Sequence, residues 1–280
     1  MPPVRVAGDR ARDLGARLLA VDAQATESVR GFYDSLAAEY HLIYPDWRKA
    51  VARQGAVLDR LIRSTLSAER VSILDCACGI GTQAIGLALR GHRVVGTDIS
   101  AASIERARAE AASFSVQVPF SVADMRARGD ALDETFDVVM ACDNSLPHLV
   151  TDDDLGAAAR SFAARLHPGG LFVASTREYD RAVQARPSST QPKVFDGPDG
   201  KRVVFQVWEW APDGHTYEVR QFILREQRTA WQVTQEATTY RALMRAELNG
   251  ILAAAGFDQI RWHTPSETGY FQQLVTARLT

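Results

Sequence analysis

The spacing of hydrophobic residues changes character twice along the chain. Residues 1–69 carry apolar positions at the period of an α-helix, and two apolar faces result. These faces comprise Leu14, Leu18, Leu19 and Val21 in an earlier stretch, and Leu58, Leu61 and Ile62 in a later one. An aromatic stretch, FYDSLAAEYHLIYPDW, lies between them. We therefore expect a helical N-terminal part with an aromatic segment that covers a site.

From Val71 onward, short apolar runs alternate with amphipathic stretches. This alternation predicts strands joined by helices, and hence a parallel sheet. The first two strands are expected at Val71 and Val94, and three more at residues 120–122, 136–140 and 171–174. A connecting helix is expected at residues 153–166. The fifth strand is expected just after the Pro168-Gly169-Gly170 turn.

The pattern changes again after Asp180. The stretch RPSSTQPKVFDGPDGKR has the composition of a loop. Polar and apolar positions then alternate, which predicts antiparallel strands at residues 202–210, 215–226 and 229–239. A helix and two last strands are expected at residues 243–255, 257–262 and 271–279.

These patterns predict an α/β fold with a Rossmann-like sheet, a helical N-terminal segment and an antiparallel β insertion before the last two strands. Four parts are expected along the chain. They are a helical and aromatic lid at 1–69, a core at 70–180, an antiparallel cover at 181–241, and a C-terminal helix with the last two core strands at 242–280.

Charge and composition limit the kinds of molecule that this protein is expected to bind. Lys and Arg number 32 against 34 Asp and Glu, so the formal net charge is −2 and no overall basic field exists for a nucleic acid or an anionic membrane. The three cysteines are too few for a disulfide scaffold, and the first residues lack the apolar run of a signal peptide. We therefore expect a cytoplasmic protein that acts on a small molecule, with no nucleic-acid or membrane partner and no bound metal; an oligomer is compatible with the sequence.

The run Asp75-Cys76-Ala77-Cys78-Gly79-Ile80-Gly81 ends the first strand and opens a helix. Gly79 and Gly81 let a ligand approach the backbone at a helix N-terminus. Asp98 ends the second strand 17 positions after Gly81, where a carboxylate can accept both hydroxyls of a ribose. The pattern favours a nucleoside ligand.

Two details indicate which nucleoside. A dinucleotide site keeps a first glycine where this chain has Ala77, and the acid Asp75 would repel a pyrophosphate. An acid suits the sulfonium and ammonium groups of S-adenosylmethionine. Asp124 closes the third strand, where it could accept from an adenine amino group while Met125 packs on the ring.

These segments resemble the class I S-adenosylmethionine-dependent methyltransferases. The resemblance rests on D-C-A-C-G-I-G, on T-D-I-S and on A-D-M. It implies cofactor contacts at Asp75, Ala77, Gly79, Gly81, Asp98, Ile99, Asp124 and Met125. Methyl transfer is then an in-line displacement in which the protein aligns two reactants and needs no strong base.

The loops that follow strands four and five should face the transferred methyl group. An Arg at a buried strand end, such as Arg177, requires a carboxylate partner, which the substrate could supply. Within the protein, Glu178, Asp180 or Asp143 could supply it instead.

These loops resemble those of the glycine N-methyltransferase family, including glycine sarcosine N-methyltransferases. The shared segments are N-S-x-x-H-L at Asn144 to Leu149, R-x-Y-D at Arg177 to Asp180, and E-T-G-Y-F-Q at 267–272. The resemblance implies N-methylation of glycine, sarcosine or a related amino acid. Arg177 and Asn144 would hold the substrate, with Tyr179 beside them. The aromatic segment would contribute Tyr33, Tyr40, Tyr44 and Trp47 as cofactor or substrate contacts, with Tyr44 and His148 near the reacting atoms.

Several alternatives stay open. The three tyrosines have the spacing of an amphipathic helix that merely packs on the sheet, and His148 could be a packed histidine. Ser175, Thr176 and Pro147 depart from the animal enzymes of the family. The acceptor could be a nitrogen or oxygen of a specialised metabolite, and an oxygen acceptor would give His148 the role of a base. A nicotinamide-dependent oxidoreductase and a non-catalytic nucleoside-binding protein are the alternatives of other classes.

Overall fold

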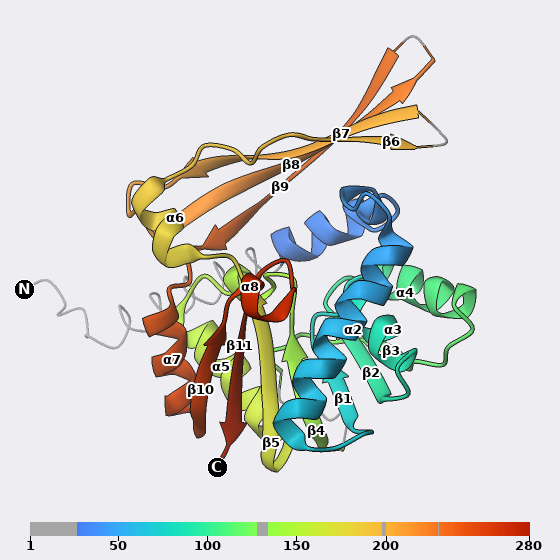
Figure 1. The fold of residues 1–280 in the computed structure, drawn as a ribbon. Helices are drawn as coiled ribbons and strands as arrows, with labels where there is room; N and C mark the ends of the chain where they lie inside the picture. Colours follow the sequence, from blue (N-terminus) through green and yellow to red (C-terminus); the bar gives the residue numbers. More distant parts are fainter. Residues whose placement is uncertain (1–26, 128–133, 198–199, 229) are drawn as a thin grey trace, which may run out of the picture.

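The computed structural model describes residues 27–127, 134–197, 200–228 and 230–280. The apolar face that begins at Leu14 lies outside these residues. Two β-sheets dominate the described chain (Figure 1).

The larger sheet has seven strands in the order β10-β11-β5-β4-β1-β2-β3. Its strands are β1 (Ser72–Asp75), β2 (Arg93–Asp98), β3 (Phe120–Val122), β4 (Phe136–Ala141), β5 (Leu166–Thr176), β10 (Phe257–His263) and β11 (Gln273–Leu279). Strands β1 to β5 pair in parallel, and β11 runs antiparallel to both β5 and β10. The predicted α/β fold with a Rossmann-like sheet is confirmed.

Helices cover both faces of this sheet because successive strand side chains point to opposite faces. Ile73 packs with α2 (Trp47–Leu66), α3 (Thr82–Ala88) and α4 (Ala101–Ser113). Its neighbour Leu74 packs in the cluster that holds α5 (Asp152–Ala164) and α7 (Arg245–Ala254). The sheet therefore has a hydrophobic core on each side.

The smaller sheet is antiparallel and contains β6 (Lys193–Gly197), β7 (Gly200–Trp210), β8 (Thr216–Gln227) and β9 (Ala230–Arg241). Figure 1 shows it lying across one end of the molecule, with α6 (Tyr179–Ala185) at one side of it. The shorter elements of the chain are η1 (Tyr40–Ile43), η2 (Leu146–His148) and α8 (Pro265–Thr268).

The described part of the N-terminal segment that precedes α2, residues 27–43, lies between the two sheets (Figure 1). Residues 27–36 are helical, and Phe32 and Leu36 form a small buried cluster with Val204 and Ile223 of the antiparallel sheet. The guanidinium of Arg202 donates to the backbone oxygens of Leu42 and Tyr44, at 3.0 and 2.7 Å. These contacts fasten the segment to the sheet that covers it.

Two local predictions were wrong. Strand β6 lies inside the stretch read as a loop, where Val194 and Phe195 pair with β7 despite the surrounding Pro, Ser and Gly residues. Strand β5 begins at Leu166, before the glycine turn rather than after it. Its partner β4 advances from Phe136 to Val138 while β5 advances from Leu166 to Leu171, so the turn is a bulge inside one strand.

Helices α2 and α3 touch through two glycines. A Cβ atom built on Gly55 would lie 2.5 Å from the carbonyl carbon of Gly86, and one built on Gly86 would lie 2.5 Å from the oxygen of Val51. These are backbone atoms, which cannot turn aside as a flexible side chain can. Close packing of the two helices therefore requires glycine at both positions.

We expect Gly86→Ala to lower the free energy of unfolding by about 1–3 kcal/mol, because the added methyl forces α2 and α3 apart. Urea denaturation followed by circular dichroism measures this. The control is Gly250→Ala in α7, where an added Cβ meets nothing within 4 Å. That variant should be neutral or more stable by up to about 1 kcal/mol, because alanine favours the helix. Equal losses in the two variants would contradict the packing argument.

Candidate active site

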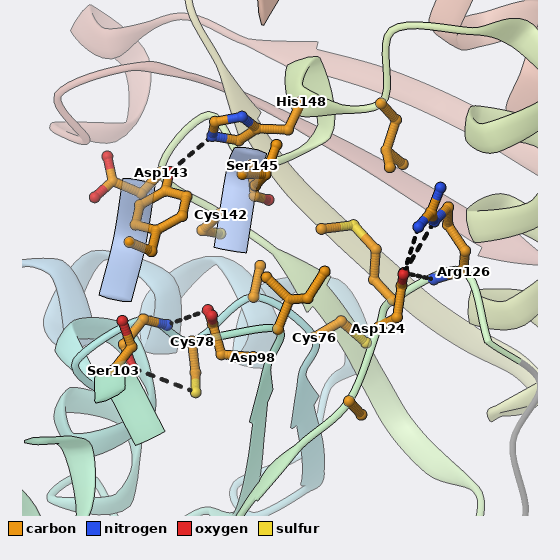
Figure 2. Close-up of a pocket in the computed structure, with 18 of the residues that line it drawn as sticks. Cys76, Cys78, Asp98, Ser103, Asp124, Arg126, Cys142, Asp143, Ser145 and His148 are labelled. Atoms are coloured by element: carbon orange, nitrogen blue, oxygen red, sulfur yellow. Dashed lines mark hydrogen bonds and ion pairs between the residues drawn. The ribbon is translucent and has the colours of Figure 1, made fainter. Parts of the chain in front are cut away.

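A cavity opens between the main sheet and the N-terminal segment. Its volume is about 960 Å³, the open solvent at its mouth included. It is lined by the turn after β1, the ends of β2 and β3, the loop after β4, and part of residues 29–40. Figure 2 shows Asp98 and Cys78 on one side, and Ser145 and His148 on the other. Its position beyond the carboxyl ends of parallel strands is typical of ligand sites in open α/β sheets.

The glycine turn and Asp98 form one wall of the cavity. Gly79 and Gly81 have positive φ angles of 52° and 90°, and a Cβ on Gly79 would point into open space. The N–H of Gly79 donates to Oδ2 of Asp98 at 2.8 Å (Figure 2). The N–H of Ser100 donates to Oδ1 at 2.9 Å. Each carboxylate oxygen keeps capacity for a further hydrogen bond, so Asp98 can accept from two ribose hydroxyls.

Asp75 is a buried carboxyl group without a hydrogen-bond partner at either oxygen. Burial raises its pKa to about 8, and the neighbouring Asp98 and Asp143 add to the rise. Burial also raises the pKa of Asp98, to about 6. Asp75 lies behind the cavity wall that Cys76 and Ala77 form. An unpartnered carboxyl group beside a second one suits a ligand that brings positive charge.

Asp124 and Met125 line the cavity beyond β3, together with Ile99 at the end of β2. The guanidinium of Arg126 donates to Oδ2 of Asp124 at 2.6 Å and to Oδ1 of Asp154 at 2.5 Å. Burial would raise the pKa of Asp124, but the hydrogen bonds from Arg126 outweigh it and hold that pKa below its usual range. Asp124 thus accepts from a protein cation beside the cavity, and its contact with adenine stays a prediction. The neighbouring Arg126 was not singled out in the sequence.

The aromatic segment meets the loop after β4. The hydroxyls of Tyr40 and Tyr44 donate to Oδ2 of Asp143 at 3.2 and 2.9 Å. A hydrogen bond of 2.8 Å joins the Tyr33 hydroxyl to Nε2 of His148. The three tyrosines do not share one helix, since Tyr33 lies in the helical residues 27–36, Tyr40 in η1 and Tyr44 after it.

Tyr33 and Tyr40 line the cavity, whereas Tyr44 and Trp47 do not. Trp47 is buried at the start of α2 and donates from Nε1 to the Thr82 hydroxyl at 2.9 Å. Its predicted contact with the cofactor therefore remains indirect in this structure, through Thr82, which does line the cavity.

The predicted substrate residues lie together, beyond the cavity wall that His148 forms. Oδ1 of Asn144 accepts from the Arg177 N–H and from the Tyr179 hydroxyl, both at 3.1 Å. Nδ2 of Asn144 and Nη1 of Arg177 are buried and lack a hydrogen bond of normal geometry. The hydroxyl of Tyr217 interacts with Arg177 and that of Tyr240 with Asn144, and Nη2 of Arg177 donates to Oε1 of Gln206 at 2.6 Å. Neither donor thus has an anionic acceptor.

Two of the three alternative carboxylate partners for Arg177 bind other residues, and the third, Glu178, is exposed. None of the ion pairs among the described residues includes Arg177. Asp143 accepts from two tyrosines, and Asp180 lies 3.6 Å from Nε of Arg245. The guanidinium of Arg177 instead lies 4.6 Å from the ring centre of Trp208 and 5.6 Å from that of Tyr240.

His148 is buried and packs its ring 4.3 Å from that of Tyr240, measured between ring centres. Burial lowers its pKa to about 3, and the charge of Arg177 lowers it further. The imidazole is therefore neutral at physiological pH, and it is a weak base. Its Nδ1 and the hydroxyl of the neighbouring Ser145 are buried without partners.

The sequence missed several residues at this site. Ser145 was given no role, and Asp143 was considered only as a partner for Arg177, although both belong to a loop that was recognised. Gln206 and Tyr240 come from the antiparallel sheet, where alternation predicts a strand but not which side chains reach the main sheet. Ser175 explains one departure from the family pattern, since its hydroxyl accepts from the Asp143 N–H at 2.7 Å and donates to Gln272 at 2.8 Å.

Comparison with known proteins shows which family the core of the main sheet resembles. Residues 73–170 match the family described as "Methyltransferase domain". The DesVI structure from Streptomyces venezuelae superposes with a TM-score of 0.71 at 22% identity, over 87% of this chain and 98% of that chain. Residues 73–170 are therefore a methyltransferase domain, and its fold is that of S-adenosylmethionine-dependent methyltransferases. Its sheet order and antiparallel β11 agree with this assignment.

Two curated relatives match this methyltransferase domain. A glycine/sarcosine N-methyltransferase of Parasynechococcus marenigrum (strain WH8102) is 31% identical over 182 residues, or 63% of this chain and 64% of that protein. A dTDP-3-amino-3,4,6-trideoxy-alpha-D-glucopyranose N,N-dimethyltransferase of Streptomyces venezuelae is 31% identical over 134 residues, or 48% of this chain and 54% of that protein. The chain spans less than two thirds of the length of these relatives.

Two findings concern the rest of the described chain. Within residues 27–127, 134–197, 200–228 and 230–280, no group of three or more His, Cys, Asp or Glu side chains could hold a metal ion. In the same residues no helix combines the length and the apolar character needed to cross a bilayer.

We expect Asp75→Asn to raise the Tm of the ligand-free methyltransferase domain at about pH 8, with a gain that shrinks toward about pH 5. In the folded protein the pKa of Asp75 is about 8, so its carboxyl stays protonated at neutral pH, whereas in the unfolded chain it loses the proton at about pH 4. Between these values the folded state binds more protons, so stability falls as pH rises. Asparagine has no such proton to lose.

Thermal unfolding of both proteins across this pH range measures the effect. Asp46→Asn is the control, because this exposed N-cap residue has a lowered pKa and is already ionised above about pH 5. A gain for Asp75→Asn that stays constant with pH would show that its carboxyl is not the destabilising group.

Proposed function

We propose that this protein transfers a methyl group from S-adenosylmethionine to the nitrogen of a small amino acid such as glycine or sarcosine. The observation that carries the proposal is the buried Arg177 guanidinium, which has an unpartnered Nη1 and no ion pair among the described residues. Such a cation requires an anion, and the planar guanidinium matches a carboxylate.

The cavity beside the glycine turn fits the proposed methyl donor. Asp98 would hold the ribose hydroxyls, and Asp124 and Met125 would contact the adenine. The buried carboxyls of Asp75 and Asp143 would oppose the positive charge of the methionine part. When bound, this cofactor supplies an activated methyl group.

On the acceptor side, Nη1 of Arg177 and Nδ2 of Asn144 would donate to the carboxylate of the substrate. Both donors lack a hydrogen bond of normal geometry within the protein, whereas Oδ1 of Asn144 and Nη2 of Arg177 are already bonded. The amine would be oriented toward the donor cavity, past His148. Holding a neutral amine in line with the methyl group can contribute about 7–11 kcal/mol through positioning alone.

Two of the curated relatives act by name on amines, which supports nitrogen as the acceptor, while others are ubiquinone biosynthesis O-methyltransferases, which keeps an oxygen acceptor as the second candidate. The amino sugar in the second name carries no carboxylate in its printed description, and Arg177 favours an acceptor that has one. We also propose a cytoplasmic location, because Cys76, Cys78 and Cys142 are free thiols, which persist in a reducing compartment.

We expect wild-type protein to release S-adenosylhomocysteine with glycine or sarcosine, within a panel that also contains larger amino acids, an amino-sugar nucleotide and a catechol. Arg177→Ala should raise KM for the amino acid by roughly 10- to 100-fold, the worth of hydrogen bonds to a charged group. KM for the methyl donor should stay unchanged. Initial rates at varied concentrations of each substrate measure both constants.

Arg220→Ala, at a half-buried position of β8 where Arg220 pairs with Glu218, is the control and should leave both constants unchanged. Turnover of only the amino sugar or the catechol would overturn the proposed acceptor. A similar small effect of Arg177→Ala on both substrates would remove Arg177 from the site.

His148→Gln should lower kcat by less than about tenfold, because the amine needs no protein base and the buried imidazole is a poor one. Loss of a general base would instead cost roughly 10²- to 10⁴-fold. The rate should rise with pH as the amine of the substrate deprotonates, with the same profile in wild type and variant. A large loss together with an altered pH profile would favour an oxygen acceptor and a catalytic His148.

A further inference from the structure

The partner of Arg177 inside the protein is a neutral amide. Nη2 of Arg177 donates to Oε1 of Gln206, which lies on β7 of the antiparallel sheet. A glutamate at this position would have the same shape and would form an ion pair with the guanidinium. The chain therefore satisfies one donor of Arg177 without neutralising its charge.

A network fixes the orientation of the Gln206 amide. Oε1 of Gln206 also accepts from Nε1 of Trp208 at 3.2 Å, and Nε2 of Gln206 donates to Oε1 of Gln221 at 2.9 Å. Nε2 of Gln221 donates in turn to the backbone oxygens of Phe205 and Phe222, at 3.2 and 3.1 Å. Because backbone oxygens only accept, the direction of each amide follows, and Gln206 presents its oxygen to Arg177.

The other groups that face the guanidinium are also neutral. Trp208 and Tyr240 present their rings, and His148 nearby is uncharged because burial lowers its pKa to about 3. The charge of Asp143 is coupled to that of Arg177, but its side chain accepts from Tyr40 and Tyr44 and forms no ion pair with the guanidinium. The positive charge of Arg177 is thus held in place without a direct ion pair among the described residues.

We propose that Gln206 is a specificity-determining residue: it positions Arg177 while keeping its charge available, and so selects an acceptor that carries a carboxylate. This inference rests on the proposed function, because it assigns the carboxylate of the amino acid to Arg177. It adds that the antiparallel sheet sets the charge preference of the site through one neutral side chain.

The substitution Gln206→Glu tests the inference with almost no change in shape. We expect KM for glycine or sarcosine to rise roughly 10- to 100-fold, because the new carboxylate competes for Arg177. The value of kcat at saturation and the Kd for S-adenosylmethionine should be unchanged. Steady-state kinetics and calorimetry measure these quantities. An unchanged KM in an active Gln206→Glu variant would overturn the inference and leave the proposed function standing.

The same sheet offers a matched control. On β9, Oε1 of the exposed Gln232 accepts from Nη2 of Arg225 at 2.9 Å, the same pair of groups away from the site. Gln232→Glu should therefore leave KM for both substrates unchanged. An equal rise in KM for Gln232→Glu would show that added negative charge on the sheet, and not the loss of a free Arg177, causes the effect.

A second measurement does not depend on turnover. Gln206→Glu loses the hydrogen bond that Nε2 of Gln206 donates to Gln221, which costs stability in any background. In the native protein the new carboxylate also gains an ion pair with Arg177. In an Arg177→Met background it gains none. Gln206→Glu should therefore lower Tm by roughly 2–4 °C more in the Arg177→Met background than in the native one.

This double-mutant comparison separates the two proposals. A loss of Tm that is smaller when Arg177 is present, without turnover of any carboxylate acceptor by wild type, would support the charge role of Gln206 and overturn the proposed acceptor class. The same change in Tm in both backgrounds would show that a nearby negative charge does not stabilise Arg177, and would overturn the inference.

Discussion

The central constraint on this structure is that charged groups at the ends of the main sheet are held away from water. Asp75, Asp98 and Asp143 are acids whose pKa values burial raises, and Arg177 lies nearby with no carboxylate partner among the described residues. A charge in such a place costs free energy unless something opposes it. The buried acids and Arg177 therefore gain most stability when ligands of the opposite charge occupy the site.

The cover over the site follows from this constraint. The antiparallel sheet and residues 27–43 exclude water from the strand ends, and their attachment is itself polar. Thr234 donates to Glu39 at 2.6 Å, Glu39 pairs with Arg225, and Arg202 donates to backbone oxygens of the segment. An apolar cluster also joins them, in which Phe32 and Leu36 pack against Val204 and Ile223 with partly buried side chains around them. Both polar and apolar contacts thus hold the cover in place.

Much of this arrangement was predictable from the sequence, for identifiable reasons. Buried parallel strands give continuous apolar runs, so β1, β2 and β4 were found close to their true bounds, and Gly79 and Asp98 were found because a turn and a strand end fix their spacing. Strand β6 was missed because an edge strand of five residues between prolines and glycines has the composition of a loop. The role of Gln206 could not be predicted, because the hydrophobic pattern does not show how a separate sheet packs against the core.

The two ends of the site carry charges of opposite sign, and this arrangement bears on selectivity as well as affinity. The acids follow β1, β2 and β4, on the side of the glycine turn, while Arg177 follows β5 under the antiparallel sheet. Asn144 spans the boundary, since its backbone N–H donates to the Ser175 oxygen and its side chain accepts from Arg177 and Tyr179. A ligand pair that presents positive charge to the first region and negative charge to the second satisfies both. An acceptor entered in reverse would place its carboxylate against the acids and its amine against the guanidinium, so electrostatic repulsion at both ends disfavours the unproductive orientation.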